Sequence, residues 1–293
     1  MKQPHPTQRA SHHGRLVLGL VVAALLVFTP SFALAAPSSA LLEVWDRSDE
    51  TNAETIDHSA WQNLLTAYLS SHPSGVNRFD YAALKASAED RAKLADYLAH
   101  LQAHDPRTYA RAEQKAYWIN FYNALTVQVV VNAYPVDSIR GIHESWIPLS
   151  GPWDDVHAQV AGQELTLNNI EHGILRPIWR DNRIHYAVNC ASYGCPNQSP
   201  TVFTAANTEE LLDAGARAYV NHPRGVDFVD DDFLVISSIY DWYVEDFGGN
   251  QTSVLAHLVQ YAEAGLAARL KDFAGSVDYE YDWNLNQPSY VHE

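Results

Sequence analysis

The sequence predicts an α+β fold, a helix-rich single domain with a small antiparallel sheet packed on a buried central helix. The segment 116–136 has no charged residue and is apolar around most of its circumference, which is typical of a helix buried on all sides. Helical patterns outnumber strand patterns along the chain, and the short strands arrive as hairpins joined by tight turns. This inventory favours a small sheet beside helices.

Residues 1–35 are predicted to form a signal peptide. Three basic residues precede an uncharged apolar run at 16–28, and Ala33-Leu34-Ala35 supplies the small residues of a cleavage site. An uncleaved membrane anchor is the alternative, although the run is short for a span. Cleavage would place the protein in the periplasm or outside the cell. We divide the remaining chain into a polar lead-in at 36–57, a domain at 58–287 and a tail at 288–293.

Charge and composition exclude several classes of partner. The net charge is −16, and loss of the three basic residues with the signal peptide makes it −19. Nucleic acids and anionic membrane surfaces both need a basic footprint, so we expect neither as a partner after cleavage. A small molecule or a peptide remains as the expected ligand, and we expect no cofactor. With 47% hydrophobic residues, 8 Trp and 16 Tyr, the chain is globular.

The first half of the chain is predicted to be mainly helical. Ser59 and Gln62 form a capping-box pattern at the start of a helix, and a second helix begins at Ser87. The central helix ends at Tyr134-Pro135, because the residue before a proline disfavours helix. A long loop then leads to a hairpin at 156–166.

The second half alternates short helices and strands. Asn168 with Glu171 predicts a capped helix that Pro177 stops. An alternating run at 184–189 predicts a strand, and Asn207 with Glu210 predicts another capped helix. The remaining predictions are a hairpin at 226–236 with an acidic solvated turn, helices at 238–247 and 252–273, and a half-buried strand at 277–283.

The stretch Arg183–Pro196 holds both cysteines and ends in a Gly-Cys-Pro turn. In an exported protein, Cys190 and Cys195 are most simply one disulfide. The alternative is a cysteine nucleophile, Cys190 or Cys195, which needs a base such as His185 or His172 and an orienting amide. Asn120 or Asn189 could supply that amide. This chemistry would hydrolyse or transfer acyl groups on peptide or amide material.

Other polar residues allow both a structural and a functional interpretation. Asn120 and Asn123 lie in the apolar helix and either tie loops to it or line a site. Glu171, beside His172 and Arg176, is either a helix cap or part of an acid–base cluster. His172 and His185 could join the two cysteines around a metal ion, but the spacing matches no standard zinc module, so we predict no metal.

Four segments in order resemble the DUF-547 family, a domain of unknown function found in bacteria and in multidomain eukaryotic proteins. They span the chain from about Trp61 to Asn286. The family carries no established activity, so the resemblance implies membership and no mechanism. The four segments are 117–125, 170–176, 184–196 and 281–286.

These observations leave three hypotheses: a cysteine-dependent hydrolase or acyl transferase, a disulfide-stabilised module that binds a ligand or a protein, and a structural partner in an assembly. Because polar residues cluster in these otherwise apolar segments, we also predict that His172, His185 and the Cys190–Cys195 loop lie in one cleft bordered by the helix that carries Asn120 and Asn123. Whether the protein is an enzyme depends on the state of the two sulfurs. The predicted ligand-binding residues are Asn123, Trp146, Glu171, Arg176 and Asn189.

Overall fold

The computed structural model describes residues 1, 37–142 and 151–290. The chain divides into two units, Met1–Leu34 and Ala35–Glu293, and the fold below is that of the second unit. The predicted signal peptide and Trp146 lie outside the described residues. Within the described part of the chain, no helix is both long and apolar enough to cross a membrane.

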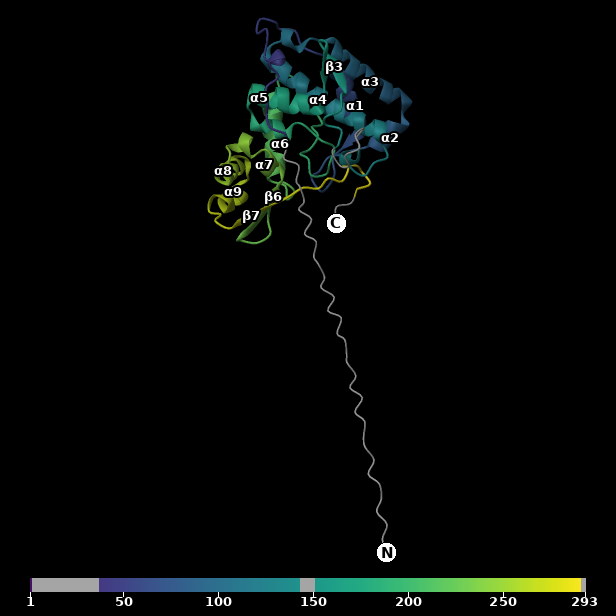
Figure 1. The fold of residues 1–293 in the computed structure, drawn as a ribbon. Coiled ribbons are helices and arrows are strands. Elements are labelled where there is room, and N and C mark those ends of the chain that lie inside the picture. The colour runs from purple at the N-terminus through teal and green to yellow at the C-terminus, as the bar shows by residue number, and fades with distance from the viewer. Residues whose placement is uncertain (2–36, 143–150, 291–293) are drawn as a thin grey trace. The chain divides into compact units, whose positions relative to one another are not determined.

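The central helix α4 spans Arg111–Ala133 and is buried along nearly its whole length. Tyr117, Trp118 and Phe121 are at most 1% exposed, and the Trp118 ring packs edge-on against Trp45 at 5.1 Å. The helix has no side-chain cap at its start, so burial of its apolar surface, rather than capping, stabilises it. The predicted buried central helix is confirmed (Figure 1).

Helices α1, α2 and α3 share one hydrophobic cluster with α4, and so does the β3–β4 hairpin. Ser87 caps α3 through the backbone N–H of Asp90, as predicted. The antiparallel strands β3 and β4 turn at Ala161-Gly162, where both residues have positive φ. The elements of this first cluster are η1 (Glu43–Trp45), α1 (Ser59–Tyr68), β1 (Leu69–Ser70), β2 (Arg78–Phe79), α2 (Tyr81–Ala86), α3 (Ala88–Ala103), η2 (Pro106–Thr108), η3 (Ile139–Gly141), β3 (Ala158–Val160) and β4 (Gln163–Leu165).

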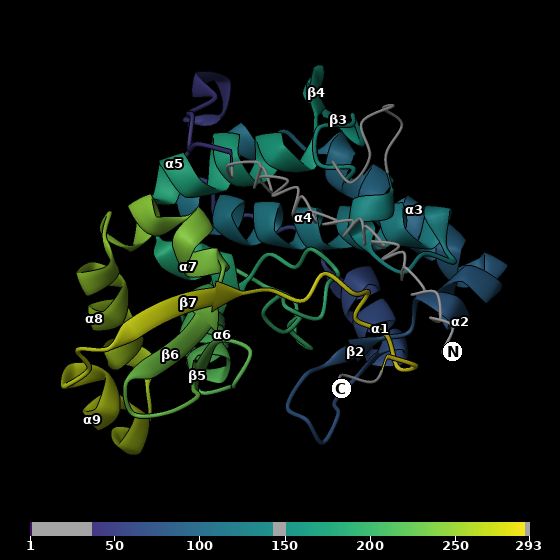
Figure 2. The same ribbon diagram turned by 60° about the horizontal axis from the view of Figure 1, so that its bottom comes forward.

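A second hydrophobic cluster contains the three-stranded sheet and the C-terminal helices. Strand β6 pairs antiparallel with β5 and parallel with β7, so this sheet is mixed. Figure 2 shows α8, α9 and the sheet at one end of α4, with α1, α2 and α3 at the other. The elements here are α6 (Thr208–Val220), β5 (Val226–Phe228), β6 (Phe233–Ser237), α7 (Ile239–Trp242), η6 (Val244–Phe247), α8 (Gln251–Tyr261), α9 (Ala264–Lys271) and β7 (Ser276–Glu280).

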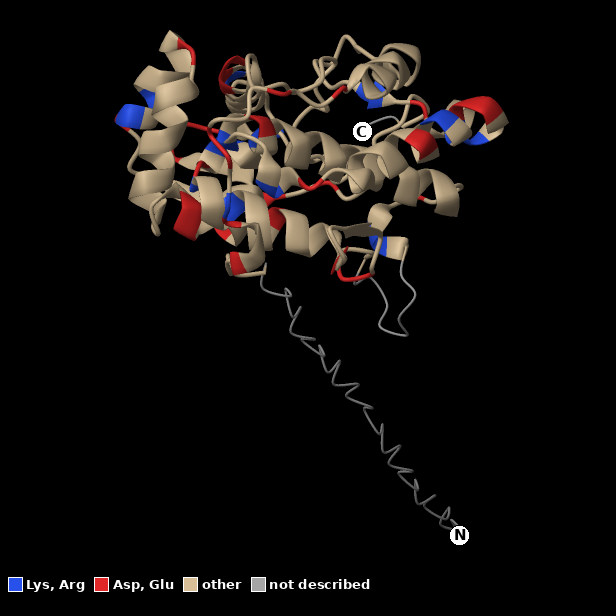
Figure 3. Cartoon of the chain, turned by 90° about the horizontal axis from the view of Figure 1, so that it is seen from above, with Lys and Arg blue, Asp and Glu red and all other residues tan. Residues whose placement is uncertain are grey.

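Three short helical segments connect the two clusters: the π-helix η4 (Asn169–Leu175), α5 (Arg176–Trp179) and η5 (Asn182–Tyr186). The helix-rich α+β class with small antiparallel strand pairs is therefore confirmed. Acidic and basic residues are interspersed along its elements (Figure 3).

Several local predictions were wrong. Residues 182–186 form a 3₁₀ turn and not a strand, because Ala187 and Val188 both bond back to Ile184. Pro177 does not stop its helix; it occupies the first turn of α5, where its missing N–H is tolerated. The single helix predicted at 252–273 is two helices, α8 and α9, separated at Ala262-Glu263.

The predicted capping residues were also misplaced. His58, not Ser59, is the N-cap of α1. Neither Asn168 nor Asn207 caps a helix with its side chain. Instead, Thr166 and Asn169 exchange side-chain and backbone bonds, and Thr204 and Asn207 do the same. Each capping pattern therefore starts at a threonine two or three residues earlier.

Candidate functional site

Four of the predicted site residues lie together in the short helical segments that connect the two hydrophobic clusters. Glu171, His172 and Arg176 come from η4 and α5, and His185 comes from η5. Tyr243 and Asp246, which the sequence did not indicate, come from the segment between α7 and α8. We call this group the seam cluster: Glu171, His172, Arg176, His185, Tyr243 and Asp246.

The π-helix is covered by the segment that precedes η1. Ala40 N–H donates to the His172 carbonyl, and Leu42 N–H donates to the Gly173 carbonyl. Gly173 allows this approach, because a Cβ there would lie 2.7 Å from Leu42 Cδ1. Single π-turns inside helices are frequent at functional sites. The glycine therefore allows the segment that precedes η1 to pack directly on the π-helix, over Glu171 and His172.

Asp246 orients the His185 ring. Its Oδ2 lies 2.6 Å from His185 Nε2 and also accepts from Arg176 Nε at 2.6 Å. The Tyr243 ring stacks on the imidazole at 4.2 Å, with 13° between the planes. His185 is 3% exposed. Hydrogen bonding on one edge and stacking on one face leave this imidazole little freedom to rotate.

Glu171 lies between the two imidazoles. Its Oε1 is 3.8 Å from His185 Nδ1 and 4.0 Å from His172 Nδ1, beyond hydrogen-bonding distance in both cases. Burial, followed by the charge of Glu171, raises the pKa of Tyr122 well above its usual range. The Thr166–Asn169 exchange places the start of the helix at Thr166, so Glu171 does not occupy the capping-box position. Its carboxylate also forms a hydrogen bond with the buried Tyr122 hydroxyl.

The protonation states of the cluster follow from burial and pairing. Burial lowers the pKa of His172 to about 4, and the Arg176 charge also lowers it. His172 is thus neutral near pH 7 and accepts from Arg176 Nη1 at 3.0 Å through Nδ1. Burial alone would raise the pKa of Asp246, but the bonds from His185 and Arg176 outweigh it and lower that pKa to about 2. Asp246 is therefore an anion at neutral pH.

Cys190 and Cys195 form a disulfide. Cys190 is partly exposed, whereas Cys195 is 3% exposed. The Ser192 hydroxyl lies 3.0 Å and the Tyr281 hydroxyl 3.1 Å from Cys190 Sγ, and Tyr281 also reaches Cys195 Sγ at 3.1 Å. No described histidine hydrogen-bonds either sulfur.

The disulfide loop is held by backbone bonds on both sides. Tyr193 N–H donates to Asn284 O and Gly194 N–H donates to Asp282 O, both at 2.8 Å. On the other side, Asn123 Nδ2 donates to Ala187 O, and its Oδ1 accepts from Asn189 N–H. Asn123 and Asn189 are therefore structural ties of the loop.

Tyr281 connects the loop to the seam cluster. Burial raises the pKa of its hydroxyl; the charge of Glu171 raises it further and that of Arg224 opposes this. The Tyr281 ring packs against Trp242 at 4.8 Å and Trp283 at 4.7 Å, and all three rings are partly exposed. The hydroxyl that touches both sulfurs thus lies within electrostatic reach of Glu171.

Asn120 lies elsewhere. Its amide pairs with both backbone groups of Phe203, at 2.7 and 3.1 Å. Asn120 thus ties the backbone at Phe203 to α4. Tyr243, Asp246 and Tyr281 were missed. The acids and aromatics interleaved in Asp241–Phe247, with Tyr243 and Asp246 three residues apart, are the signal that could have indicated two of them.

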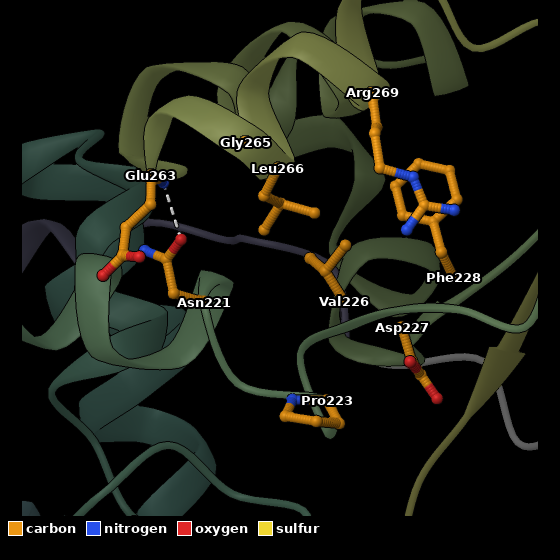
Figure 4. A pocket seen from close by; sticks show the side chains of 9 residues that line it. All are labelled: Asn221, Pro223, Val226, Asp227, Phe228, Glu263, Gly265, Leu266 and Arg269. Atoms are coloured by element: carbon orange, nitrogen blue, oxygen red, sulfur yellow. Dashed lines mark hydrogen bonds between the residues drawn. The ribbon is translucent and has the colours of Figure 1, made fainter.

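Two further observations concern metal ligands and cavities. Among the described residues, no group of three or more His, Cys, Asp or Glu is placed to hold a metal ion. A cavity of about 300 Å³ lies between β5 and α9 and contains no predicted site residue (Figure 4). In that cavity Arg269 lies over the Phe228 ring, and Glu263 N–H donates to Asn221 Oδ1.

Residues 106–220 match the model of a family described as protein of unknown function, DUF547. This segment belongs to the DUF547 family. No curated protein and no solved structure matches the chain. The DUF547 segment contains three of the four resembling motifs, including both cysteines and His172 and His185. Tyr243, Asp246 and Tyr281, which complete the site, lie after its end.

Proposed function

We propose that this DUF547 protein is a cysteine-dependent hydrolase or acyl transferase on peptide or amide material, which is inactive while its disulfide is closed. The supporting observation is the asymmetry of the two sulfurs. Cys190 is partly exposed, whereas Cys195 is buried. The Tyr281 hydroxyl lies 3.1 Å from both sulfurs, and the Ser192 hydroxyl lies closer to Cys190 Sγ, at 3.0 Å, than to Cys195 Sγ, at 3.5 Å. Hydroxyl donors favour a thiolate over a thiol. The partly exposed Cys190 is therefore the proposed attacking sulfur, and the buried Cys195 is its disulfide partner.

The reaction would begin with a dithiol reductant, which gives two electrons and two protons to the disulfide. The Cys190 thiol would give its proton to His185, and the resulting thiolate would attack the carbonyl carbon of an amide. The C–N bond would break, and the amine would leave with the proton returned by His185, so that a thioester remains on Cys190. Water or a second amine would take the acyl group from the thioester. Asp246 would hold the imidazole, as the third member of such groups does.

The experiment uses a peptidyl vinyl sulfone, which traps cysteine nucleophiles, on oxidised protein, reduced protein and Cys195→Ser. We expect labelling of Cys190 in the reduced protein and in Cys195→Ser, and none in the oxidised protein. His185→Gln should slow the labelling, and Asp246→Asn should shift its pH profile. Exposed His100→Gln is the control for histidine replacement. Labelling of Cys190 no faster than that of free cysteine, and unaffected by His185→Gln, would remove the enzyme proposal.

The closed disulfide supports a second candidate, a non-catalytic binding module. The loop is fixed by backbone bonds, and the partly exposed rings of Trp242, Tyr281 and Trp283 lie beside it. Aromatic surfaces beside a few fixed polar groups are typical of ligand sites. A ligand that binds the oxidised protein, and loses affinity in Trp242→Ala without any labelling of Cys190, would favour this candidate.

A further inference from the structure

Two buried or partly buried arginines lie beside the disulfide loop without an acidic partner. Arg78 on β2 is 3% exposed, and Arg224 follows α6 and is partly exposed. Neither makes an ion pair among the described residues, although acidic residues outnumber basic ones by 35 to 19 in the chain. An arginine cannot lose its charge in a protein, so a buried one is normally paired.

Tyr193 of the disulfide loop holds the two arginines together. The Arg78 guanidinium carbon lies 4.7 Å from the centre of the Tyr193 ring, and Arg224 Nη1 donates to the Tyr193 carbonyl at 3.0 Å. Burial lowers the pKa of Arg224, and the charge of Arg78 lowers it too. Two like charges thus lie within electrostatic reach of each other in a partly desolvated place.

The hydrogen bonds that these arginines make leave donors unused. Arg78 donates through Nη1 to Asn286 Oδ1 at 2.8 Å, and Arg224 donates to Tyr193 and to Asn197 Oδ1. The Nε atoms of both are buried and have no partner in the part of the chain that the structure describes. On Arg78, the unused Nε–H is on the edge shared with Nη2, which offers two parallel donors of the kind that a carboxylate accepts.

We propose that Arg78 and Arg224 form a carboxylate-binding site beside the disulfide loop. The ligand would place its two oxygens on the Nε–Nη2 edge of Arg78, with the Arg224 guanidinium as the second cation. The hydrogen-bond partners of these arginines are amides and a carbonyl, and their other contacts are with the rings of Tyr193, Tyr290 and Tyr219. None of these groups is a carboxylate, so a bound anion would supply the countercharge that these partners lack. This site goes beyond the proposed thiol chemistry and does not depend on it.

The test is titration calorimetry on the oxidised full chain at constant ionic strength. N-acetylalanine is the probe, N-acetylalaninamide lacks the carboxylate, and inorganic phosphate is the tetrahedral alternative. We expect N-acetylalanine to bind and to raise the melting temperature, and the amide to do neither. Arg78→Gln and Arg224→Gln should weaken binding about ten- to hundredfold, the usual effect of losing a charged hydrogen bond.

Arg217→Gln is the matched control, because Arg217 is an exposed arginine that lies over a tyrosine ring, that of Tyr261. This variant should bind N-acetylalanine as the native protein does. Arg224→Lys keeps the charge without the fork and should bind more weakly than the native protein. Should Arg78→Gln fail to fold, the partly exposed Arg224 decides the question. Equal binding of acid and amide, tighter binding of phosphate than of the carboxylate, or an equal loss in Arg217→Gln would each overturn the proposal.

Discussion

Replacement of Asn123 by alanine should both destabilise the fold and loosen the disulfide loop. Asn123 is 1% exposed and bonds Ala187 O at 2.9 Å and Asn189 N at 2.8 Å. The substitution removes two hydrogen bonds and leaves two buried backbone groups unpaired. At about 1 kcal/mol for each bond, and more for each orphaned group, the free energy of unfolding should fall by about 2–4 kcal/mol. Urea denaturation measures this loss.

Asn120 supplies a matched control. It is also 1% exposed on α4 and also bonds one carbonyl and one N–H of a buried backbone segment, at Phe203. Asn120→Ala should therefore cost a similar free energy. Only Asn123→Ala should speed the reduction of the Cys190–Cys195 disulfide by dithiothreitol. Thiol titration under native conditions measures the rate of this reduction. Equal acceleration in both variants, or a stability loss below 1 kcal/mol for Asn123→Ala, would refute the assignment of Asn123 as the tie of the loop.

Three further predictions concern the seam cluster. His172 has its pKa lowered to about 4 from 6.5. Between pH 4 and pH 6.5 the unfolded chain therefore binds more protons than the folded protein, and stability should fall as the pH drops through this range. His172→Gln should flatten the dependence of the urea midpoint on pH in the same range. Asp246 has its pKa lowered to about 2 from 3.8. Its contribution to the free energy of unfolding, about 2 kcal/mol, should therefore be present above pH 4 and lost towards pH 2. Asp246→Asn should lack this contribution at all pH values in the same assay. Gly173→Ala should lower the free energy of unfolding by about 1–3 kcal/mol, because the added methyl group overpacks against Leu42. In a double-mutant cycle, Leu42→Ala should relieve part of this loss. Additive effects of the two substitutions would contradict the contact.

The buried helix and the hairpins were predictable because their signals are local. The charge-free segment 116–136, of 21 residues, is stable only in a core. An alternating run with a tight turn pairs with itself as a hairpin. Capping was less predictable, because more than one polar residue near a helix start offers the required side chain. At two of the three wrong positions, Asn168 and Asn207, a threonine upstream exchanges bonds with an asparagine three residues later. The sequence contains both patterns, and only tertiary packing selects between them.

The candidate site was predictable in part. Glu171, His172, Arg176 and His185 lie within fifteen residues of one another along the chain, and the structure brings them together. Asp246 joins them from sixty-one residues beyond His185, and no periodicity in its own segment points to that contact. The interval between them includes α6 and the β5–β6 pair. Sequence reasoning therefore found the residues on the connecting helices and missed those that the second hydrophobic cluster contributes.

Whether a buried polar residue is structural or functional can be argued from its unused hydrogen-bonding capacity. The amides of Asn120 and Asn123 each use a donor and an acceptor on backbone groups that would otherwise be orphaned, so the fold alone accounts for them. Arg78 differs, because its Nε is buried and has no partner among the described residues, although the residue carries a full charge. Burying a cation without an anion costs stability that an apolar side chain of similar volume would not cost. A carboxylate ligand beside the loop would offset this cost, whereas packing on the Tyr193 and Tyr290 rings alone would not need one, and the carboxylate titration distinguishes the two explanations.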